Sequence, residues 1–176
     1  GMSVDKAYNE ILKGRKGKTV IVGVIDSGVD IEHEDLKDVI WTNKDEIAKE
    51  LCWQMGRPIR YAGGEVDSFA ERSRYMISAV NEALAPIQVS EKAGFIRYID
   101  REPVGVVLVI APWNYPLHTP INTIIPALLA GNTVILKHAS QTPLCAERID
   151  EAFQAAGLPD GVFQCLHMTH EATETG

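Results

Sequence analysis

The chain has 176 residues, with 17 basic and 24 acidic side chains and a formal net charge of −7. This length suffices for one ordinary domain or two small ones, and 45% hydrophobic with 23% charged residues is the composition of a globular protein. The acidic balance argues against nucleic acid as a partner. No apolar run reaches the roughly 20 residues that cross a bilayer, so we do not expect a membrane partner either.

The N-terminal stretch predicts a helix, a strand and a polar segment. Ser3 can cap a helix over residues 4–12, and residues 19–25 are almost purely β-branched and apolar. Such a run is typical of a strand that is buried on both faces. The strand ends at Asp26, and a short helix over residues 36–40 can follow the polar stretch.

Two amphipathic helices are predicted next. Asn43 can cap the first, which Gly56 ends, and an acidic residue three positions after Asn43 completes a capping-box pattern. Ser68 has the same pattern, so it predicts a second helix over residues 69–84. Residues 86–100 alternate weakly between apolar and polar side chains, which indicates extended structure.

Strands and helices then alternate along the chain. They run in the order 104–110 (strand), 119–129 (helix), 133–136 (strand), 143–156 (helix) and 162–166 (strand). Short apolar strands separated by helices predict an α/β fold with a parallel sheet and right-handed crossovers, in which the first strand is buried. Residues 168–176 have no strong pattern.

The three cysteines, Cys52, Cys145 and Cys165, are widely spaced and odd in number. This usage fits a reducing compartment, and it fits neither a disulfide framework nor a zinc site. No signal peptide precedes the first helix, so we expect a cytoplasmic protein. The cysteines are expected to be packed thiols, and no metal site is predicted.

The N-terminal strand and the corner after it resemble the aspartate segment of subtilisin-like serine proteases, over about residues 3–47. The matching run is VIVGVIDSGVD at 20–30, followed by a His-x-Asp-Leu segment that begins at His33. The resemblance implies that Asp26 is a triad aspartate, which orients a histidine that activates a serine. The family's histidine and serine segments are absent from the chain. The alternative role for Asp26 is a carboxylate that accepts backbone N–H bonds at the following turn.

The chain from about residue 44 to 173 resembles aldehyde dehydrogenases, specifically the N-terminal half of their cofactor domain. Three segments carry the resemblance, namely APWNYP at 111–116, LLAGNTVILK at 128–137 and AGLPDGVF at 156–163. The Lys-His-Ala sequence at 137–139 resembles succinate-semialdehyde dehydrogenases more closely than it resembles family members with the commoner Lys-Pro sequence. The fold implied is a partial Rossmann-like parallel sheet with flanking helices, preceded by the subtilisin-like strand segment.

This resemblance implies a cofactor, NAD or NADP, bound at the carboxyl ends of the strands. Ile110 and Trp113 would approach the cofactor, Asn114 would donate its amide to a developing oxyanion, and Lys137 would hydrogen-bond ribose hydroxyls. Ser140 stands where many NAD-preferring members have glutamate, so NADP should be tolerated. Without the combined pattern, Trp113 could be a core aromatic, Asn114 a turn residue and Lys137 a solvated strand end.

Several motifs of the family do not occur in the chain. The phosphate-facing Phe-Thr-Gly-Ser loop, the glutamate base and the nucleophilic cysteine are missing, and none of the three cysteines matches the nucleophile motif. The expectation is therefore a truncated, inactive cofactor-binding region. The alternatives are a fragment of a subtilisin-like endopeptidase, or a fusion or assembly chimera without evolved activity.

The two resemblances meet at residues 43–48, which places one domain at 1–47 and the other at 48–176. A truncated sheet has an exposed edge and uncovered apolar faces, and such surfaces favour association between chains. We therefore predict a homo-oligomer or an aggregation-prone protein.

Overall fold

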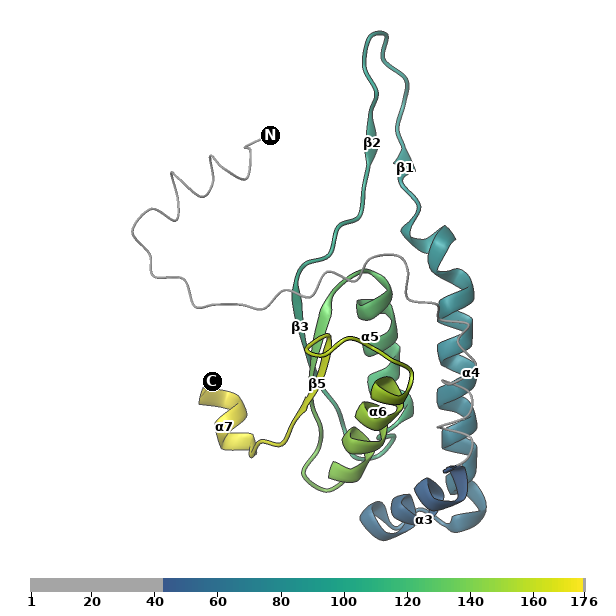
Figure 1. The fold of residues 1–176 in the computed structure, drawn as a ribbon, viewed down its shortest axis with the longest axis vertical. Helices are drawn as coiled ribbons and strands as arrows, with labels where there is room; N and C mark the ends of the chain where they lie inside the picture. The colour runs from purple at the N-terminus through teal and green to yellow at the C-terminus, as the bar shows by residue number, and fades with distance from the viewer. Residues whose placement is uncertain (1–42, 176) are drawn as a thin grey trace.

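The computed structural model describes residues 43–175 (Figure 1). The elements are α3 (Lys44–Met55), α4 (Ile59–Leu84), β1 (Ile87–Gln88), β2 (Tyr98–Ile99), β3 (Val106–Ile110), α5 (His118–Leu129), β4 (Thr133–Lys137), α6 (Pro143–Ala155), β5 (Phe163–Leu166) and α7 (His170–Thr175). The predicted helix at 4–12, the strand at 19–25 and Asp26 lie outside the described residues, as does the rest of the subtilisin-like segment up to residue 42.

The centre of the fold is a parallel sheet of three strands in the order β3-β4-β5. Its register pairs Val107 with Val134, and Val134 with Phe163. Helix α5 packs on β3 and β4, and α6 packs on β5, with both helices on the same side of the sheet (Figure 1). The predicted α/β fold is confirmed, and every strand and helix predicted between 104 and 166 is found within two residues of its expected bounds.

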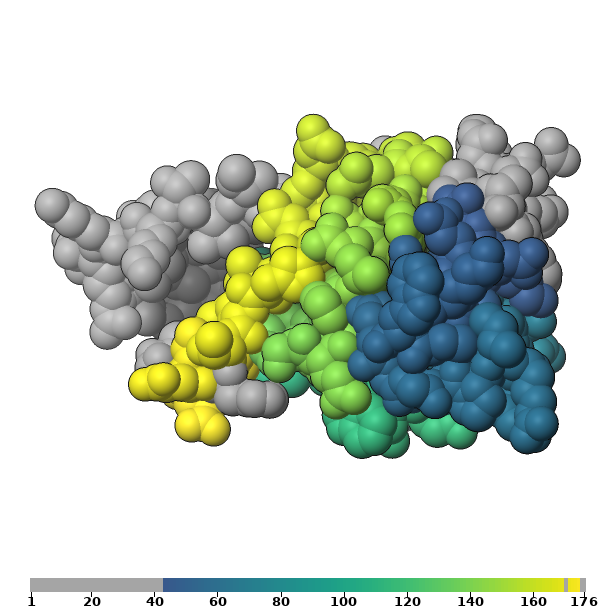
Figure 2. Space-filling view, turned by 90° about the horizontal axis from the view of Figure 1, so that it is seen from below, coloured from purple at the N-terminus to yellow at the C-terminus, as the bar shows by residue number. Residues whose placement is uncertain are grey.

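Helices α3 and α4 form a second layer over the first. Helix α4 packs along α5, and α3 contacts both α4 and α6. Figure 2 shows the dark-blue surface of α3 directly against the green surface of α6. Side chains from every layer are fully buried between them, including Leu51, Ile121, Leu136 and Ile149. Burying one such aliphatic side chain contributes about 1.5–3 kcal/mol to folding.

Helix α4 begins at Ile59, well before the predicted start at Phe69, so this boundary was wrong. The residues upstream already carry the buried stripe of the helix, as Val66 shows, and packing against α5 outweighs the local capping signal. Ser68 is therefore not a cap. Its hydroxyl lies 2.8 Å from Nδ1 of His118 and links α4 to the first turn of α5. The predicted end of α3 is confirmed, since Gly56 follows it with a left-handed φ of 73°.

Strand β3 has one exposed face, which corrects the prediction that it is buried. Val106, Leu108 and Ile110 are exposed, whereas Val109 between them is buried against the helices. The cause is that, among the described elements, the helix that packs on β3 is α5, which covers one face of the strand. An apolar run predicts a strand, but it does not reveal which neighbours cover the strand.

Asn132 fixes the start of β3 relative to the end of α5. Its Oδ1 accepts hydrogen bonds from the backbone N–H groups of Val104 (2.7 Å) and Gly105 (3.0 Å), and its Nδ2 donates to the carbonyl of Ala127 (2.9 Å). Gly131 has a φ of 82°, which a side chain would disfavour, and this conformation turns the chain out of α5. The Ala-Gly-Asn segment at 130–132 thus connects α5 to β4 and fixes the start of β3.

The remaining elements lie at the margins. β1 and β2 pair antiparallel within the segment predicted to be extended, and this hairpin projects away from the sheet (Figure 1). The short helix α7 forms where the sequence showed no pattern. Among the described residues, no helix is both long and apolar enough to cross a membrane.

Candidate functional site

Two loops meet at the carboxyl edge of the sheet. The β3 loop comprises residues 111–117, and the β4 loop comprises residues 138–142. The ladder between the strands continues into the loops, because the N–H of Ala111 donates to the carbonyl of Lys137 over 3.0 Å. In open α/β sheets, ligands bind outside this edge of the strands. The two loops therefore form the candidate site.

A buried histidine joins the loops. Nε2 of His138 lies 2.8 Å from the carbonyl oxygen of Pro116, and Nδ1 lies 3.2 Å from the hydroxyl of Thr142. Because a carbonyl only accepts, Nε2 carries the proton and donates, and Nδ1 accepts from the hydroxyl. Burial lowers the pKa of His138, more than the hydrogen bonds to Pro116 and Ala139 raise it. The imidazole is therefore a neutral tie between the β3 loop and the β4 loop.

Because His138 is buried and neutral, we expect the protein to lose stability in acid. In the unfolded chain His138 titrates near 6.5, and in the folded chain it titrates lower, so the unfolded state binds more protons below about pH 6.5. The free energy of unfolding should fall as the pH drops through that range, by at most about 1.4 kcal/mol per pH unit from this group. Urea unfolding at several pH values measures the slope. His138→Gln should flatten it; equal slopes for wild type and His138→Gln would contradict the assignment.

The start of α5, which follows the β3 loop, is held from α4. The carboxylate of Glu65 accepts hydrogen bonds at Oε1 from the backbone N–H groups of Leu117 (2.9 Å) and His118 (3.3 Å). A negative charge is favourable at a helix N-terminus, where N–H groups lack partners within the helix. Oε2 of the same carboxylate forms an ion pair with Arg57. Glu65 is thus a buried cap supplied by another helix.

Arg57 also contacts the β3 loop. It donates to the backbone carbonyl of Asn114 over 2.9 Å, and its guanidinium lies 4.7 Å from the ring centre of Tyr115. Sequence reasoning missed Arg57 and Glu65. The signal that could have found Glu65 is its place on the apolar stripe of α4, beside Val66, where a charged residue is rarely buried without a partner.

The start of α6, which follows the β4 loop, is also held from outside. Oε1 of Gln54 on α3 accepts from the N–H of Leu144 over 2.9 Å. Thr142, the residue before α6, makes no capping bond because its hydroxyl contacts His138. The second helix layer therefore positions both helices that follow the site loops.

The structure brings the predicted cofactor-binding residues to this one edge. Ile110 ends β3, Trp113 and Asn114 lie in the β3 loop, Lys137 ends β4 and Ser140 lies in the β4 loop. All except Lys137 are exposed. Trp113, which is 48% exposed, is therefore not a core aromatic. The roles of these five residues stay predictions, because position alone does not test them.

Lys137 is the unusual group at the site. It is only 1% exposed, so it is not a solvated strand end. A buried cation is costly unless an acceptor compensates for its lost hydration. The group is suited to a ligand that presents hydroxyl or phosphate oxygens at the ends of the strands.

None of the cysteines lies in the two loops, and all three are free thiols. Burial, followed by the charges of Glu65 and Glu50, raises the pKa of Cys145 to about 12. Burial, Asp150 and Glu147 raise the pKa of Cys165. A thiol with a raised pKa stays protonated and is a poor nucleophile.

Curated sequences point to one family. The sequence model of the aldehyde dehydrogenase family matches residues 34–175 and so begins ahead of the predicted boundary at 47/48. A probable succinate-semialdehyde dehydrogenase [NADP(+)] of Synechocystis is 40% identical over 131 residues, which are 73% of this chain and 28% of that protein. The succinate-semialdehyde dehydrogenase [NADP(+)] of Mycobacterium avium is 34% identical over 139 residues, which are 78% of this chain and 29% of that protein. The chain thus spans less than a third of these relatives.

Solved structures are also similar to this chain. Succinic semialdehyde dehydrogenase from Streptococcus pyogenes, in complex with NADP+, superposes with a TM-score of 0.74 at 25% identity, over 85% of this chain and 33% of that one. PnpE in complex with nicotinamide adenine dinucleotide superposes with a TM-score of 0.72 at 34% identity, over 77% of this chain and 28% of that one. These matches do not support the subtilisin-like interpretation of residues 3–47, which stays a prediction. The chain belongs to the aldehyde dehydrogenase family.

Proposed function

We propose that the chain carries part of the cofactor-binding region of a succinate-semialdehyde-dehydrogenase-like enzyme, and that its two site loops bind NADP or NAD. The parent reaction is the NAD(P)-dependent oxidation of an aldehyde to a carboxylic acid. The observation that carries the proposal is the place of Lys137, a cationic side chain that is 1% exposed at the end of β4, next to His138, which ties the loops together.

Lys137 and Ser140 would bind the adenosine ribose. In this proposal the ammonium donates hydrogen bonds to ribose hydroxyls, which replace the hydration that burial removes. Ser140 is exposed and neutral, so the β4 loop places no carboxylate there to repel a 2′-phosphate. The relatives named as NADP(+) enzymes support tolerance of NADP.

Asn114 would supply the oxyanion donor, since its backbone is fixed by Arg57 while its side chain is exposed. Ile110 and Trp113 would pack beside the nicotinamide end. A bound nicotinamide supplies the hydride acceptor. Two of the chain's three thiols, Cys145 and Cys165, are poor nucleophiles because their pKa values are raised, and Cys52 lies on α3, outside the site loops. The 176-residue chain assayed by itself is therefore expected not to oxidise an aldehyde.

Calorimetric titration of the full chain with NADP+ tests the binding. We expect weak saturable binding that Lys137→Met reduces at least about tenfold, because a hydrogen bond to a charged group is worth about 1.5–3 kcal/mol. Lys49→Met, at an exposed lysine of α3, is the matched control and should leave the affinity unchanged. No binding at millimolar cofactor, or equal affinity for Lys137→Met and wild type, would remove the proposed role.

The same preparation assayed with succinate semialdehyde and NADP+ should form no NADPH. Turnover that survives replacement of all three cysteines would contradict the argument from thiol reactivity.

Association between chains is also part of the proposal. The exposed face of β3 presents Val106, Leu108 and Ile110, and the hairpin adds Phe95 and Ile96. Such exposed apolar surfaces favour a homo-oligomer or aggregation, which light scattering over a concentration series measures. A reducing compartment such as the cytoplasm is supported by the three free thiols.

A further inference from the structure

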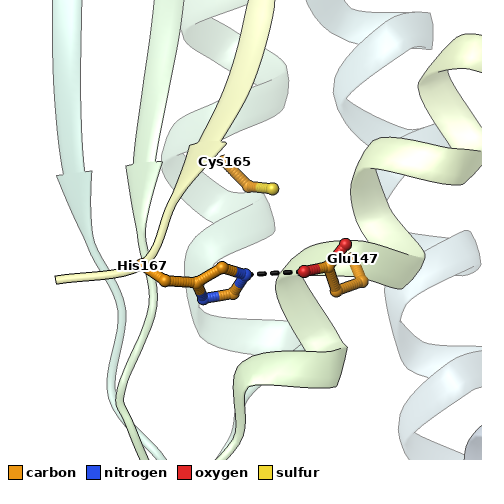
Figure 3. Close-up of side chains that lie close together, drawn as sticks. All are labelled: Glu147, Cys165 and His167. Atoms are coloured by element: carbon orange, nitrogen blue, oxygen red, sulfur yellow. Dashed lines mark hydrogen bonds and ion pairs between the residues drawn. The ribbon is translucent and has the colours of Figure 1, made fainter.

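Three side chains with different donor atoms converge away from the site loops. Cys165 lies at the end of β5, His167 directly follows this strand, and Glu147 reaches toward them from α6 (Figure 3). The ligand atoms, Sγ, an imidazole nitrogen and a carboxylate oxygen, all lie within 4.8 Å of one another. The sequence predicted no metal site because the third residue is distant along the chain. The fold brings it close.

Local structure explains the convergence. Side chains two residues apart on a strand point to the same face, so Cys165 and His167 both face α6. Phe163, two residues earlier, faces the same way and packs against Phe153 of α6, with ring centres 4.9 Å apart. Nε2 of His167 is 2.6 Å from Oε1 of Glu147, so the imidazole is already directed at the carboxylate.

The donor set suits one class of ion. Thiolate, imidazole and carboxylate together are ligands of zinc, whereas calcium and magnesium prefer oxygen alone. Zinc bond lengths of about 2.0–2.3 Å place tetrahedral ligand atoms about 3.3–3.6 Å apart. The three atoms therefore need shifts of only about 1 Å to surround an ion. Glu147 and His167 are partly exposed, which gives an ion access and leaves room for a water as fourth ligand.

The charges around the cluster favour a cation. The pKa of the Cys165 thiol is raised first by burial and then by the charges of Asp150 and Glu147, which lie one turn apart on α6. Asp150 itself has a raised pKa, caused first by burial and then by the charges of Glu147 and Glu151. Arg148 between them is engaged by Glu50 and Glu151. A divalent cation would relieve this excess of negative charge.

We propose that Glu147, Cys165 and His167 bind one Zn²⁺ ion, with a water as the fourth ligand. On binding, the Cys165 thiol releases its proton to solvent and the thiolate forms the S–Zn bond. The hydrogen bond that Nε2–H of His167 donates to Glu147 opens, and Nε2 releases its proton to solvent so that its lone pair faces the ion. Nδ1 then holds the single proton of the neutral ring, taken up from solvent if the ring was neutral before binding. The ion links α6 to the end of β5 and is independent of the cofactor proposal.

Titration of the reduced, metal-free full chain with Co²⁺ tests the site. Wild type should bind one equivalent, with a sulfur-to-cobalt charge-transfer band in the near ultraviolet and the d–d bands of a tetrahedral ion, both displaced by Zn²⁺. Cys165→Ser should abolish the charge-transfer band, and Cys52→Ser, at a half-buried thiol on α3, should keep it. Loss of a partner that only orients a ligand weakens metal binding about 10–100-fold, so His167→Ala and Glu147→Gln should cost at least about tenfold.

Further measurements distinguish loss of zinc binding from failure to fold, and they show whether the zinc site is independent of NADP+ binding. Circular dichroism checks each variant, and Zn²⁺ should raise the Tm of wild type and Cys52→Ser but not of Cys165→Ser. NADP+ binding should be the same in Cys165→Ser and wild type. The proposal is overturned if wild type shows no charge-transfer band, if the band persists in Cys165→Ser, or if it is lost in Cys52→Ser.

Discussion

Replacing Arg57 with methionine is expected to lower the free energy of unfolding by about 3–5 kcal/mol, because the Glu65 carboxylate then stays buried without its counter-charge. The side chains of Arg57 and Glu65 are 14% and 1% exposed, so water cannot take the place of the guanidinium. The same change removes the hydrogen bond to the carbonyl of Asn114. Typical domains are stable by about 5–15 kcal/mol, so the loss is a large share of the total.

Urea unfolding followed by circular dichroism measures this effect. The control is Asp67→Asn, which breaks the ion pair with Lys44, where the two side chains are 44% and 30% exposed. A partly solvated pair is worth at most about 1 kcal/mol. Adding Glu65→Gln to Arg57→Met should recover part of the loss, because it removes the unpaired charge. If Arg57→Met costs no more than Asp67→Asn, the ion pair does not stabilise the buried cap.

The sequence predicted the parts of the fold that depend on local pattern. Alternating apolar runs and helical stretches gave the parallel sheet, and Gly56 ends α3 as expected. Motif resemblance placed Trp113, Asn114 and Lys137 at one edge of the sheet, and the structure has them there. These successes share a cause, since each signal lies within a few residues of the feature that it predicts.

Features that depend on distant partners were not predicted. Ser68 has the sequence of a cap but lies inside α4, because packing with α5 extends that helix upstream. Glu65 reaches the N–H of Leu117 across 52 residues of chain, and His138 reaches Pro116 across 22. No local pattern encodes such distances.

The layered fold connects stability to the candidate site. Glu65 and Gln54, both from the second helix layer, hold the first turns of α5 and α6, which follow the β3 loop and the β4 loop. Arg57 and His138 then hold the loops themselves. The residues that would touch a cofactor are mostly exposed, whereas those that position them are buried or partly buried. Loss of a positioning residue should therefore affect folding and binding together.

Replacing Leu136 with alanine tests the centre of the sheet and should cost about 2–5 kcal/mol. Leu136 lies in the middle strand, next to Lys137, and its side chain is 0% exposed. Its register partners are Val109 on β3 and Cys165 on β5, so truncation leaves a cavity beneath the helices. A cavity that neighbours cannot fill adds to the lost transfer free energy.

Leu108→Ala is the matched control, since the same truncation is made in the adjacent strand at a side chain that is 57% exposed. It should change the free energy of unfolding by about 0.5 kcal/mol or less, because surface substitutions leave no cavity. Equal losses in the two variants would mean that the face of β3 presenting Leu108 is covered in solution. Light scattering on the same samples would then show an oligomer, and a monomer with equal losses would contradict the arrangement of the sheet described here.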